Sequence, residues 1–174
     1  ELPLLVKQLL LQRGFTGGME TELFLDPRLS HLSDPFLMGE MRAAVDRIFR
    51  AVDEGETVCI YGDYDVDGVT SVALLRAILM AYDLDPQYFI PVRSREGYGL
   101  SEAGIKRCLC ECADPPSLLI TVDCGTSSVK EVDMLNSLGI DVIILDHHEA
   151  GPLGRPDAAA VVNAKIEENS PYTY

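Results

Sequence analysis

The sequence predicts an α/β fold, in which a doubly wound, mainly parallel sheet of about five strands follows an N-terminal helical extension. From residue 58 onward, short apolar segments rich in β-branched residues alternate with segments of helical length. Turn residues such as Gly55 and Gly139 separate these segments. A hydrophobic content of 47% over 174 residues is enough for the core of one globular domain.

The helical extension is expected over residues 1–55. Its first helix is expected over 2–15, where leucines recur at helical spacing. Residues 16–18 are expected to open a linker, and residues 23–27 are expected to form a short turn-rich link. A second helix is expected to begin at Asp34, which can cap it, with Pro35 suited to the first helical position.

The α/β domain is expected over residues 56–174. Its strands are the short apolar runs, which are 58–60, 88–92, 117–122, 140–145 and 158–163. The helices between them are expected over 72–80, 101–112 and 129–138. Residues 93–100 are expected to form a loop.

Three aspartates, Asp63, Asp65 and Asp67, follow the first expected strand. If that strand stays extended, its period of two places them on one side, with neighbours about 6–7 Å apart. Like charges so close repel, and a divalent cation converts the repulsion into coordination because hard cations take carboxylate oxygens. One alternative is a calcium-binding EF-hand loop, but Leu74 stands where its bidentate glutamate is needed. The other alternative is a solvated acidic turn.

Acids or histidines also follow two later expected strands, at Asp123 and at residues 146–148. The carboxyl ends of parallel strands share one edge of the sheet, where ligands bind at a switch in strand order. Carboxylates joined by imidazole suit Mn²⁺ or Mg²⁺ more than zinc, and histidine favours Mn²⁺. Helix N-termini expected at 68–71 and 125–127 are either ordinary caps or donors of backbone N–H groups to an anion.

We expect two ions, because three loops supply enough ligands and paired ions are typical of phosphoryl transfer and hydrolysis. One ion is assigned to Asp65 with help from Asp63. The other is assigned to Asp67 and His147, and Asp123 is the expected bridge. A water shared by the ions would be the nucleophile.

Further candidates surround the ions. Side chains of successive residues diverge, so only one of His147 and His148 is expected to coordinate, while the other contacts the phosphate or supports the ligands from behind. Asp146 is expected to orient a histidine. A purely structural role is the alternative for Asp146 and His148.

Arg93 and Arg95 are candidates to bind phosphate through paired hydrogen bonds, and Tyr98 can stack on a base. The alternative is that these residues belong to an ordinary solvated loop. The expected catalytic residues are Asp65, Asp67, Asp123, His147 and His148.

Composition bears on partners and location. A net charge of −14 disfavours nucleic acid unless the acids hold cations and the basic surface lies elsewhere. No apolar run is long enough for a membrane span, and the absence of a leader predicts a cytoplasmic protein. The 5 cysteines are expected to be reduced and largely buried. A metal clip of Cys108, Cys110 and Cys112 is disfavoured because no second ligand pair accompanies it.

Several segments together resemble the DHH phosphoesterases, a family named for the triplet seen here as Asp146-His147-His148. The likeness is strongest to bacterial members that act on single-stranded DNA, and it covers essentially the whole chain. The segments that carry it are YGDYDVDGVTS (61–71), EGYGL (96–100), TVDCG (121–125), DHH (146–148) and VVN (161–163).

The resemblance implies a phosphodiesterase with two Mn²⁺ or Mg²⁺ ions that degrades single-stranded DNA from its 5′ end to mononucleotides, in DNA repair and recombination. Family members continue with a further aspartate motif and a second domain, so this chain is expected to be an amino-terminal fragment. The alternatives are a DHH phosphoesterase acting on short oligonucleotides or cyclic dinucleotides, and a non-catalytic metal-binding module. The resemblance implies as metal ligands Asp63, Asp65, Asp67, Asp123 and His147, and as a phosphate contact His148.

Overall fold

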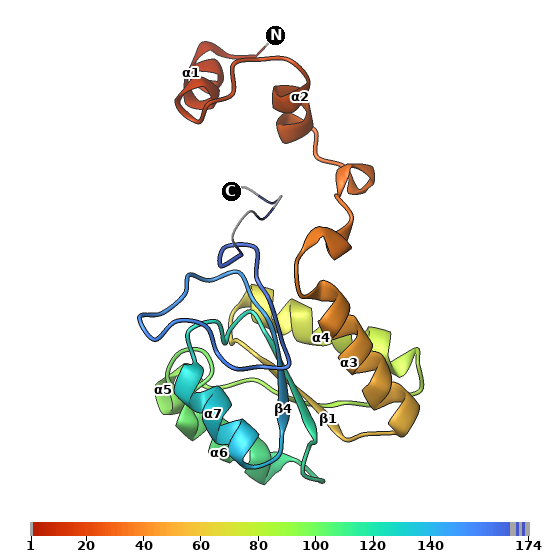
Figure 1. Cartoon of the computed structure of the whole chain (residues 1–174). Helices are drawn as coiled ribbons and strands as arrows, with labels where there is room; N and C mark the ends of the chain where they lie inside the picture. The colour runs from red at the N-terminus through yellow and green to blue at the C-terminus, as the bar shows by residue number, and fades with distance from the viewer. Residues whose placement is uncertain (1, 168–169, 171, 173–174) are drawn as a thin grey trace. The chain divides into compact units, whose positions relative to one another are not determined.

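The computed structural model describes residues 2–167, 170 and 172. The chain forms two compact units, Glu1–Asp34 and Pro35–Tyr174 (Figure 1). This division falls earlier than the predicted boundary at 55–56, because helix α3 (Met41–Glu54) packs on the sheet of the second unit. Within the described residues, no helix has both the length and the apolar character that a membrane span needs.

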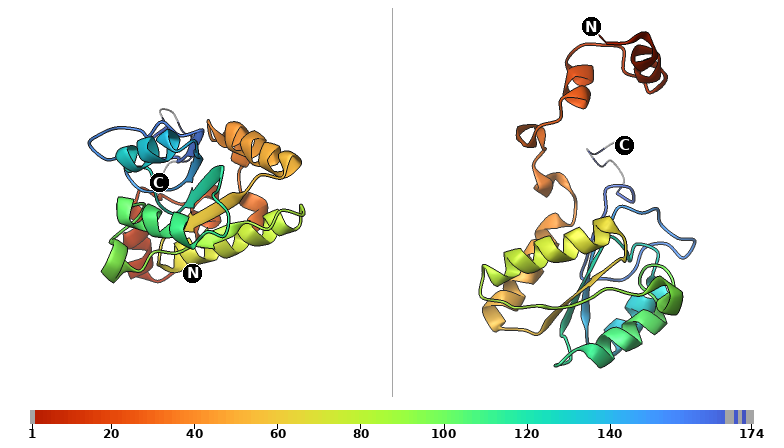
Figure 2. Two further views of the ribbon diagram at one scale, coloured as in Figure 1. Left: turned by 90° about the horizontal axis from the view of Figure 1, so that it is seen from below. Right: turned by 180° about the vertical axis from the view of Figure 1, so that it is seen from behind.

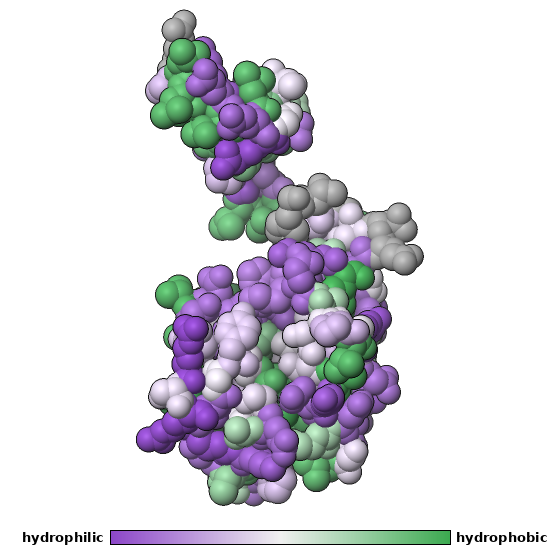
Figure 3. All heavy atoms as spheres, turned by 90° about the vertical axis from the view of Figure 1, so that its left-hand side faces the viewer, coloured by the Kyte–Doolittle hydropathy of each residue, from purple (hydrophilic) through white to green (hydrophobic). Residues whose placement is uncertain are grey.

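The first unit contains α1 (Leu4–Gln12), α2 (Met19–Leu25) and a 3₁₀ turn at Leu29–His31. Its aromatic contact is a stack of Phe15 on Phe24, with ring centroids 4.4 Å apart. The turn-rich link predicted in this stretch is wrong where α2 forms. The glutamates in the first turn of α2 stabilise this helix, because negative charge interacts favourably with the positive end of the helix dipole. Figure 3 shows apolar side chains at the surface of this unit, and the most exposed are Leu4, Leu5, Met19, Leu29 and Leu32.

The second unit begins with a 3₁₀ turn at Pro35–Leu37. The α-helix predicted from Asp34 instead begins at Met41, because the intervening backbone closes three-residue turns, such as the hydrogen bond from the Met38 N–H to the Pro35 carbonyl at 3.1 Å. Helix α3 ends, as predicted, at Gly55, which adopts a left-handed conformation with φ 63°.

Five strands form one parallel sheet, in the order β2-β1-β3-β4-β5. Their bounds are β1 (Val58–Gly62), β2 (Gln87–Phe89), β3 (Leu118–Val122), β4 (Asp141–Leu145) and β5 (Ala160–Val162). The helices between them are α4 (Val66–Met80), α5 (Arg93–Glu96), α6 (Glu102–Glu111) and α7 (Val129–Ser137). The predicted doubly wound fold is confirmed, although α5 is a single helical turn where a loop was expected.

Helices cover both faces of the sheet (Figure 2). Helices α3 and α4 contribute Ala44, Ala51 and Val72 to one buried cluster, and α6 and α7 contribute Ile105 and Val132 to the other. The chain runs from β1 outward to β2 and then returns to place β3 on the other side of β1. The switch in strand order therefore lies between β1 and β3, where doubly wound folds bind ligands.

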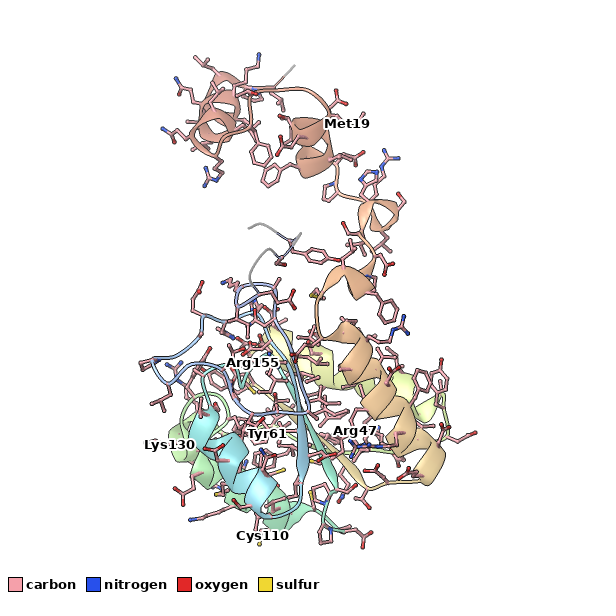
Figure 4. The ribbon with its side chains drawn as sticks, in the orientation of Figure 1. Met19, Arg47, Tyr61, Cys110, Lys130 and Arg155 are labelled. Carbon is pink, nitrogen blue, oxygen red and sulfur yellow. The ribbon has the colours of Figure 1, made fainter. Side chains whose placement is uncertain are left out.

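A buried arginine fastens α3 to the strands (Figure 4). Arg47 is only 8% exposed, and its guanidinium donates to Glu56 at 2.8 Å and to Asp141 at 2.7 Å. The hydrogen bond from Arg47 is the main cause that lowers the pKa of Glu56 below its ordinary value. This network fixes α3 beside the starts of β1 and β4.

Replacing Arg47 by methionine should lower the free energy of unfolding by about 2 kcal/mol, because two carboxylates lose a partly buried donor. Urea unfolding followed by circular dichroism measures the change. The matched control is Arg50→Met, whose exposed side chain contacts the same Asp141 at 3.3 Å. The control should change stability by less than about 0.5 kcal/mol.

The difference between wild type and Arg47→Met should also depend on pH. Because the folded pKa of Glu56 is lowered, its contribution is present above the unfolded value of about 4.3 and is lost as the pH falls through the folded pKa. The stability difference should therefore shrink in acid. A difference that is the same at neutral and acidic pH would contradict the role given to Glu56.

Candidate metal centre

The first acidic group lies where β1 passes into α4. Asp63 follows β1 directly and is completely buried. Asp65 then caps α4, and its Oδ1 accepts hydrogen bonds from the N–H groups of Asp67 at 2.9 Å and Gly68 at 3.1 Å. The predicted extended run through Asp67 was therefore wrong: the strand stops at Gly62, and the cap starts the helix at Val66 instead of residue 72.

Glycine allows this tight passage from strand to helix. A Cβ atom at Gly68 would collide with the backbone of Asp63, and one at Gly62 would collide with the side chain of Val72. The first turn of α4 can therefore lie directly against the backbone that presents Asp63. The N–H group of Gly68 is bonded to the Asp65 side chain, and that of Val69 is bonded to the Asp65 carbonyl. Of the two interpretations of the terminus at 68–71, an ordinary cap is therefore the one that these two residues show.

The second acid, Asp123, comes from the end of β3. Its backbone has φ 62°, a left-handed conformation that aspartate adopts more readily than most residues. Its N–H still donates to the Leu145 carbonyl at 2.9 Å, so the ladder between β3 and β4 extends to this residue. The chain then turns away, and the buried carboxylate remains at the edge of the sheet.

These loops bring the acids and histidines into two groups that share Asp123. Donor atoms of Asp63, Asp65 and Asp123 lie within 4.8 Å of one another, as do those of Asp123, His147 and His148. His147 Nε2 lies 2.9 Å from Asp123 Oδ1. The sharing supports the predicted bridging position of Asp123.

Asp67 belongs to neither group. Its position in the first turn of α4 separates it from the other acids, although it lines the same cavity of about 530 Å³ as Asp123 and His147. The apolar wall of this cavity comes from α3 and the turn before it, including Met38, Met41 and Val45. Sequence reasoning assigned no site residue to that segment, because its helical spacing indicates only core packing.

The electrostatics of the shared acids favour a bound cation. Both side-chain oxygens of Asp63 and Oδ2 of Asp123 are buried, and none of the described residues donates a hydrogen bond to them. Burial, and next the neighbouring Asp65, raise the pKa of Asp123. A buried carboxylate without a partner is costly, and a divalent cation satisfies several such oxygens together. Oxygens with imidazole nitrogen fit Mn²⁺ or Mg²⁺.

Asp146 has a different task, because its oxygens are fully used within the loop. Oδ2 accepts the Thr126 N–H at 2.9 Å, while Oδ1 accepts the His147 N–H at 2.7 Å and lies 2.7 Å from His148 Nδ1. Burial would raise the pKa of Asp146, but the hydrogen bonds, those from Thr126 foremost, outweigh it and lower the pKa. The expected contact of Asp146 with a histidine is present, and the Thr126 N–H is not available to an anion.

Asn163 is a positioning residue that was not among the predicted site residues. Its Nδ2 donates to Thr126 Oγ1 at 2.8 Å and to the His148 carbonyl at 2.8 Å, which ties β5 to both loops. The available signals were its place as the last residue of the last expected strand, at the edge that carries the acids, and its membership of the VVN segment at 161–163.

Aromatic residues line the rim beside His148. The Tyr98 hydroxyl lies 2.9 Å from His148 Nε2, and the Tyr98 ring meets the edge of Tyr64, with centroids 6.3 Å apart. The Arg93 guanidinium lies 5.4 Å from the centroid of Tyr64. The structure thus brings Tyr98 and Arg93 to this rim, and adds Tyr64. Arg95 is exposed, and within the described residues its side chain forms no hydrogen bond or ion pair with the centre.

Comparison with known proteins gives a family match. The model of the DHH family, N-terminal domain, matches residues 57–172. The single-stranded-DNA-specific exonuclease RecJ of Bacillus subtilis (strain 168) is 43% identical over 161 residues, covering 92% of this chain and 20% of that protein. The protein of the same name from Escherichia coli (strain K12) is 33% identical, covering 97% of this chain and 28% of that protein. This chain therefore spans less than a third of the length of these relatives.

Two solved structures are also similar. A crystal structure of exonuclease RecJ bound to manganese matches with a TM-score of 0.69 and 31% identity, over 79% of this chain and 34% of that one. RecJ from Thermus thermophilus in complex with Mn²⁺ matches with a TM-score of 0.67 and 29% identity, over 94% of this chain and 22% of that one.

Replacing Asp123 by asparagine should weaken Mn²⁺ binding at least tenfold, because both ligand groups lose a shared oxygen. The metal-free protein should become more stable at neutral pH by about 1 kcal/mol, since a buried charge beside Asp63 and Asp65 is removed and asparagine tolerates positive φ. Calorimetric titration with MnCl₂ and urea unfolding in EDTA measure the two effects.

The matched control for this variant is Asp133→Asn, which removes one exposed negative charge on α7. It should leave Mn²⁺ affinity and stability nearly unchanged. The raised pKa of Asp123 gives the sign of the pH effect: the advantage of asparagine should appear as the pH rises through that pKa and vanish in acid. Equal Mn²⁺ affinity in wild type and Asp123→Asn would contradict the shared-ligand assignment.

Proposed function

This chain belongs to the DHH family, and we propose that it forms the metal-binding part of an exonuclease that removes nucleotides from the 5′ end of single-stranded DNA. The observation that carries the proposal is the pair of ligand groups that share buried Asp123 at the switch point of the sheet. The similarity to RecJ exonucleases over nearly the whole chain supports the choice of DNA as substrate. The 5′ polarity rests on the family resemblance.

The proposed cofactors are two Mn²⁺ or Mg²⁺ ions. Asp63 and Asp65 would hold one ion, and Asp123 would serve both. His147 would hold the other ion, together with Asp67, which lies outside both groups and lines the same cavity. Bound divalent ions supply a hydroxide near neutral pH and neutralise the charge of the phosphate under attack. The protein's own contribution is to hold the carboxylates at the edge of the sheet, with oxygens of Asp63 and Asp123 left without a hydrogen bond from the described residues.

The residues beside the ions would hold the substrate. Asp146 accepts the Nδ1–H of His148, so that Nε2 faces the rim beside the Tyr98 hydroxyl. When both ring nitrogens carry a proton, Nε2 would donate to a phosphate oxygen there. Arg93 and Arg95 would contact backbone phosphates further along the strand. Tyr98 and Tyr64 offer ring faces and edges on which a base can pack.

An exonuclease that degrades single strands from the 5′ end acts on intermediates of DNA repair and recombination. We therefore propose DNA repair and recombination as the setting of this protein, and the cytoplasm as its location. A net charge of −14 repels a DNA strand. Binding of DNA at the metal centre therefore requires that the ions and the arginines beside them neutralise the phosphates.

The test is hydrolysis of single-stranded DNA labelled at either end, with Mn²⁺, beside duplex DNA and a dinucleotide. Mononucleotides should appear first from the 5′ end of the single strand. Asp63→Asn, which keeps the shape of a buried side chain, should abolish the reaction, and Asp133→Asn should not. Turnover of the dinucleotide alone would indicate a phosphoesterase of small substrates. Mn²⁺ binding without turnover of any substrate would contradict nuclease activity of this chain by itself.

The two histidines should separate metal binding from substrate contact. His148→Ala should lower kcat at least 100-fold, the loss typical of a donor to developing charge, while Mn²⁺ affinity stays within about twofold. His147→Ala should weaken Mn²⁺ binding itself at least tenfold. Calorimetric titration and steady-state kinetics on both variants measure the separation, and equal loss of Mn²⁺ affinity in both would disprove it.

A further inference from the structure

Three cysteine sulfurs meet on the α6 side of the sheet, away from the acidic centre. Cys59 lies on β1, Cys108 lies on α6, and Cys112 is the residue that caps the C-terminal end of α6. Because Cys108 and Cys112 are four residues apart, their side chains share one face of the helix. The Sγ atoms of all three lie within 4.8 Å of one another, and those of Cys59 and Cys108 are 3.6 Å apart.

We propose that Cys59, Cys108 and Cys112 form a binding site for a thiophilic cation of the Zn²⁺ class. Tetrahedral thiolates at about 2.3 Å from zinc lie about 3.8 Å from each other, close to the observed spacing of Cys59 and Cys108. Thiolates select soft cations, whereas the carboxylates of the acidic centre select hard ones. The two sites therefore accept different metals.

The proposed ligands differ from the sequence motif in one member. The motif Cys108-x-Cys110-x-Cys112 was disfavoured as a metal clip because the sequence showed no second ligand pair. Cys110 is exposed and points outward (Figure 4), and Cys59 from β1 takes its place. Only the fold brings Cys59 to α6, because it lies 49 positions before Cys108 in the chain.

Of the three proposed ligands, Cys112 lies nearest to solvent. Cys59 and Cys108 are buried, but Cys112 is only half-buried and caps the C-terminal end of α6, where the backbone leaves the helix. The proposal therefore requires that an ion enters from the side of Cys112. With three protein ligands, a fourth position is left for water or another small ligand, which makes the site exchangeable instead of a closed structural zinc site.

The first test is titration of the reduced, anaerobic protein with Cd²⁺, followed through the ultraviolet charge-transfer band of cadmium–thiolate bonds. Carboxylate ligands give no such band, so binding at the acidic centre does not interfere. One Cd²⁺ per chain should produce the band, and Zn²⁺ should displace it. Cys110→Ser is the matched control and should behave like wild type. Cys112→Ser and Cys59→Ser should weaken Cd²⁺ binding at least tenfold.

The second test uses wild type alone, so it does not depend on the folding of a variant with a changed core residue. One equivalent of Zn²⁺ should slow alkylation of Cys112 by iodoacetamide at least tenfold and leave Cys110 unchanged, as measured by mass spectrometry. Absence of the band in wild type, its loss in Cys110→Ser, or equal alkylation of Cys112 with and without Zn²⁺ would overturn the proposal.

Discussion

The crowding of carboxylates between β1 and β3 is the constraint on which the site depends. Asp63 and Asp123 are buried at the ends of neighbouring parallel strands, with oxygens that receive no hydrogen bond from the described residues. Without a cation, this arrangement opposes folding, because buried charges of one sign repel and lack solvation. Binding of divalent ions at the switch point of the sheet would offset the unfavourable free energy of placing these carboxylates together.

The rest of the site keeps these oxygens free for a ligand. Asp65 uses its carboxylate to start α4, Asp146 uses both of its oxygens to hold the histidine loop, and Asn163 ties that loop to the neighbouring one. Further away, Arg47 fastens α3, whose apolar side chains form one wall of the cavity. Among the described residues, the carboxylates with buried oxygens that lack a hydrogen bond are therefore those of Asp63 and Asp123.

The sequence was sufficient to predict the strands and the edge at which the acids meet, because buried parallel strands are continuous apolar runs and their ends share one edge. It could not predict features that depend on contacts between distant residues. The early start of α4 required Asp65 to act as a cap, and the role of Asn163 required β5 to lie beside β4. Similarly, Cys59 joins the α6 cysteines only through the packing of helix on sheet.

The most direct test of the central claim is electron paramagnetic resonance of the protein titrated with Mn²⁺. If Asp123 serves two ions, as proposed, Mn²⁺ should give a spin-coupled spectrum at two Mn²⁺ per chain. The same titration of Asp123→Asn should give no coupled signal. A wild-type spectrum of isolated, uncoupled Mn²⁺ at every ratio would contradict the shared two-ion centre.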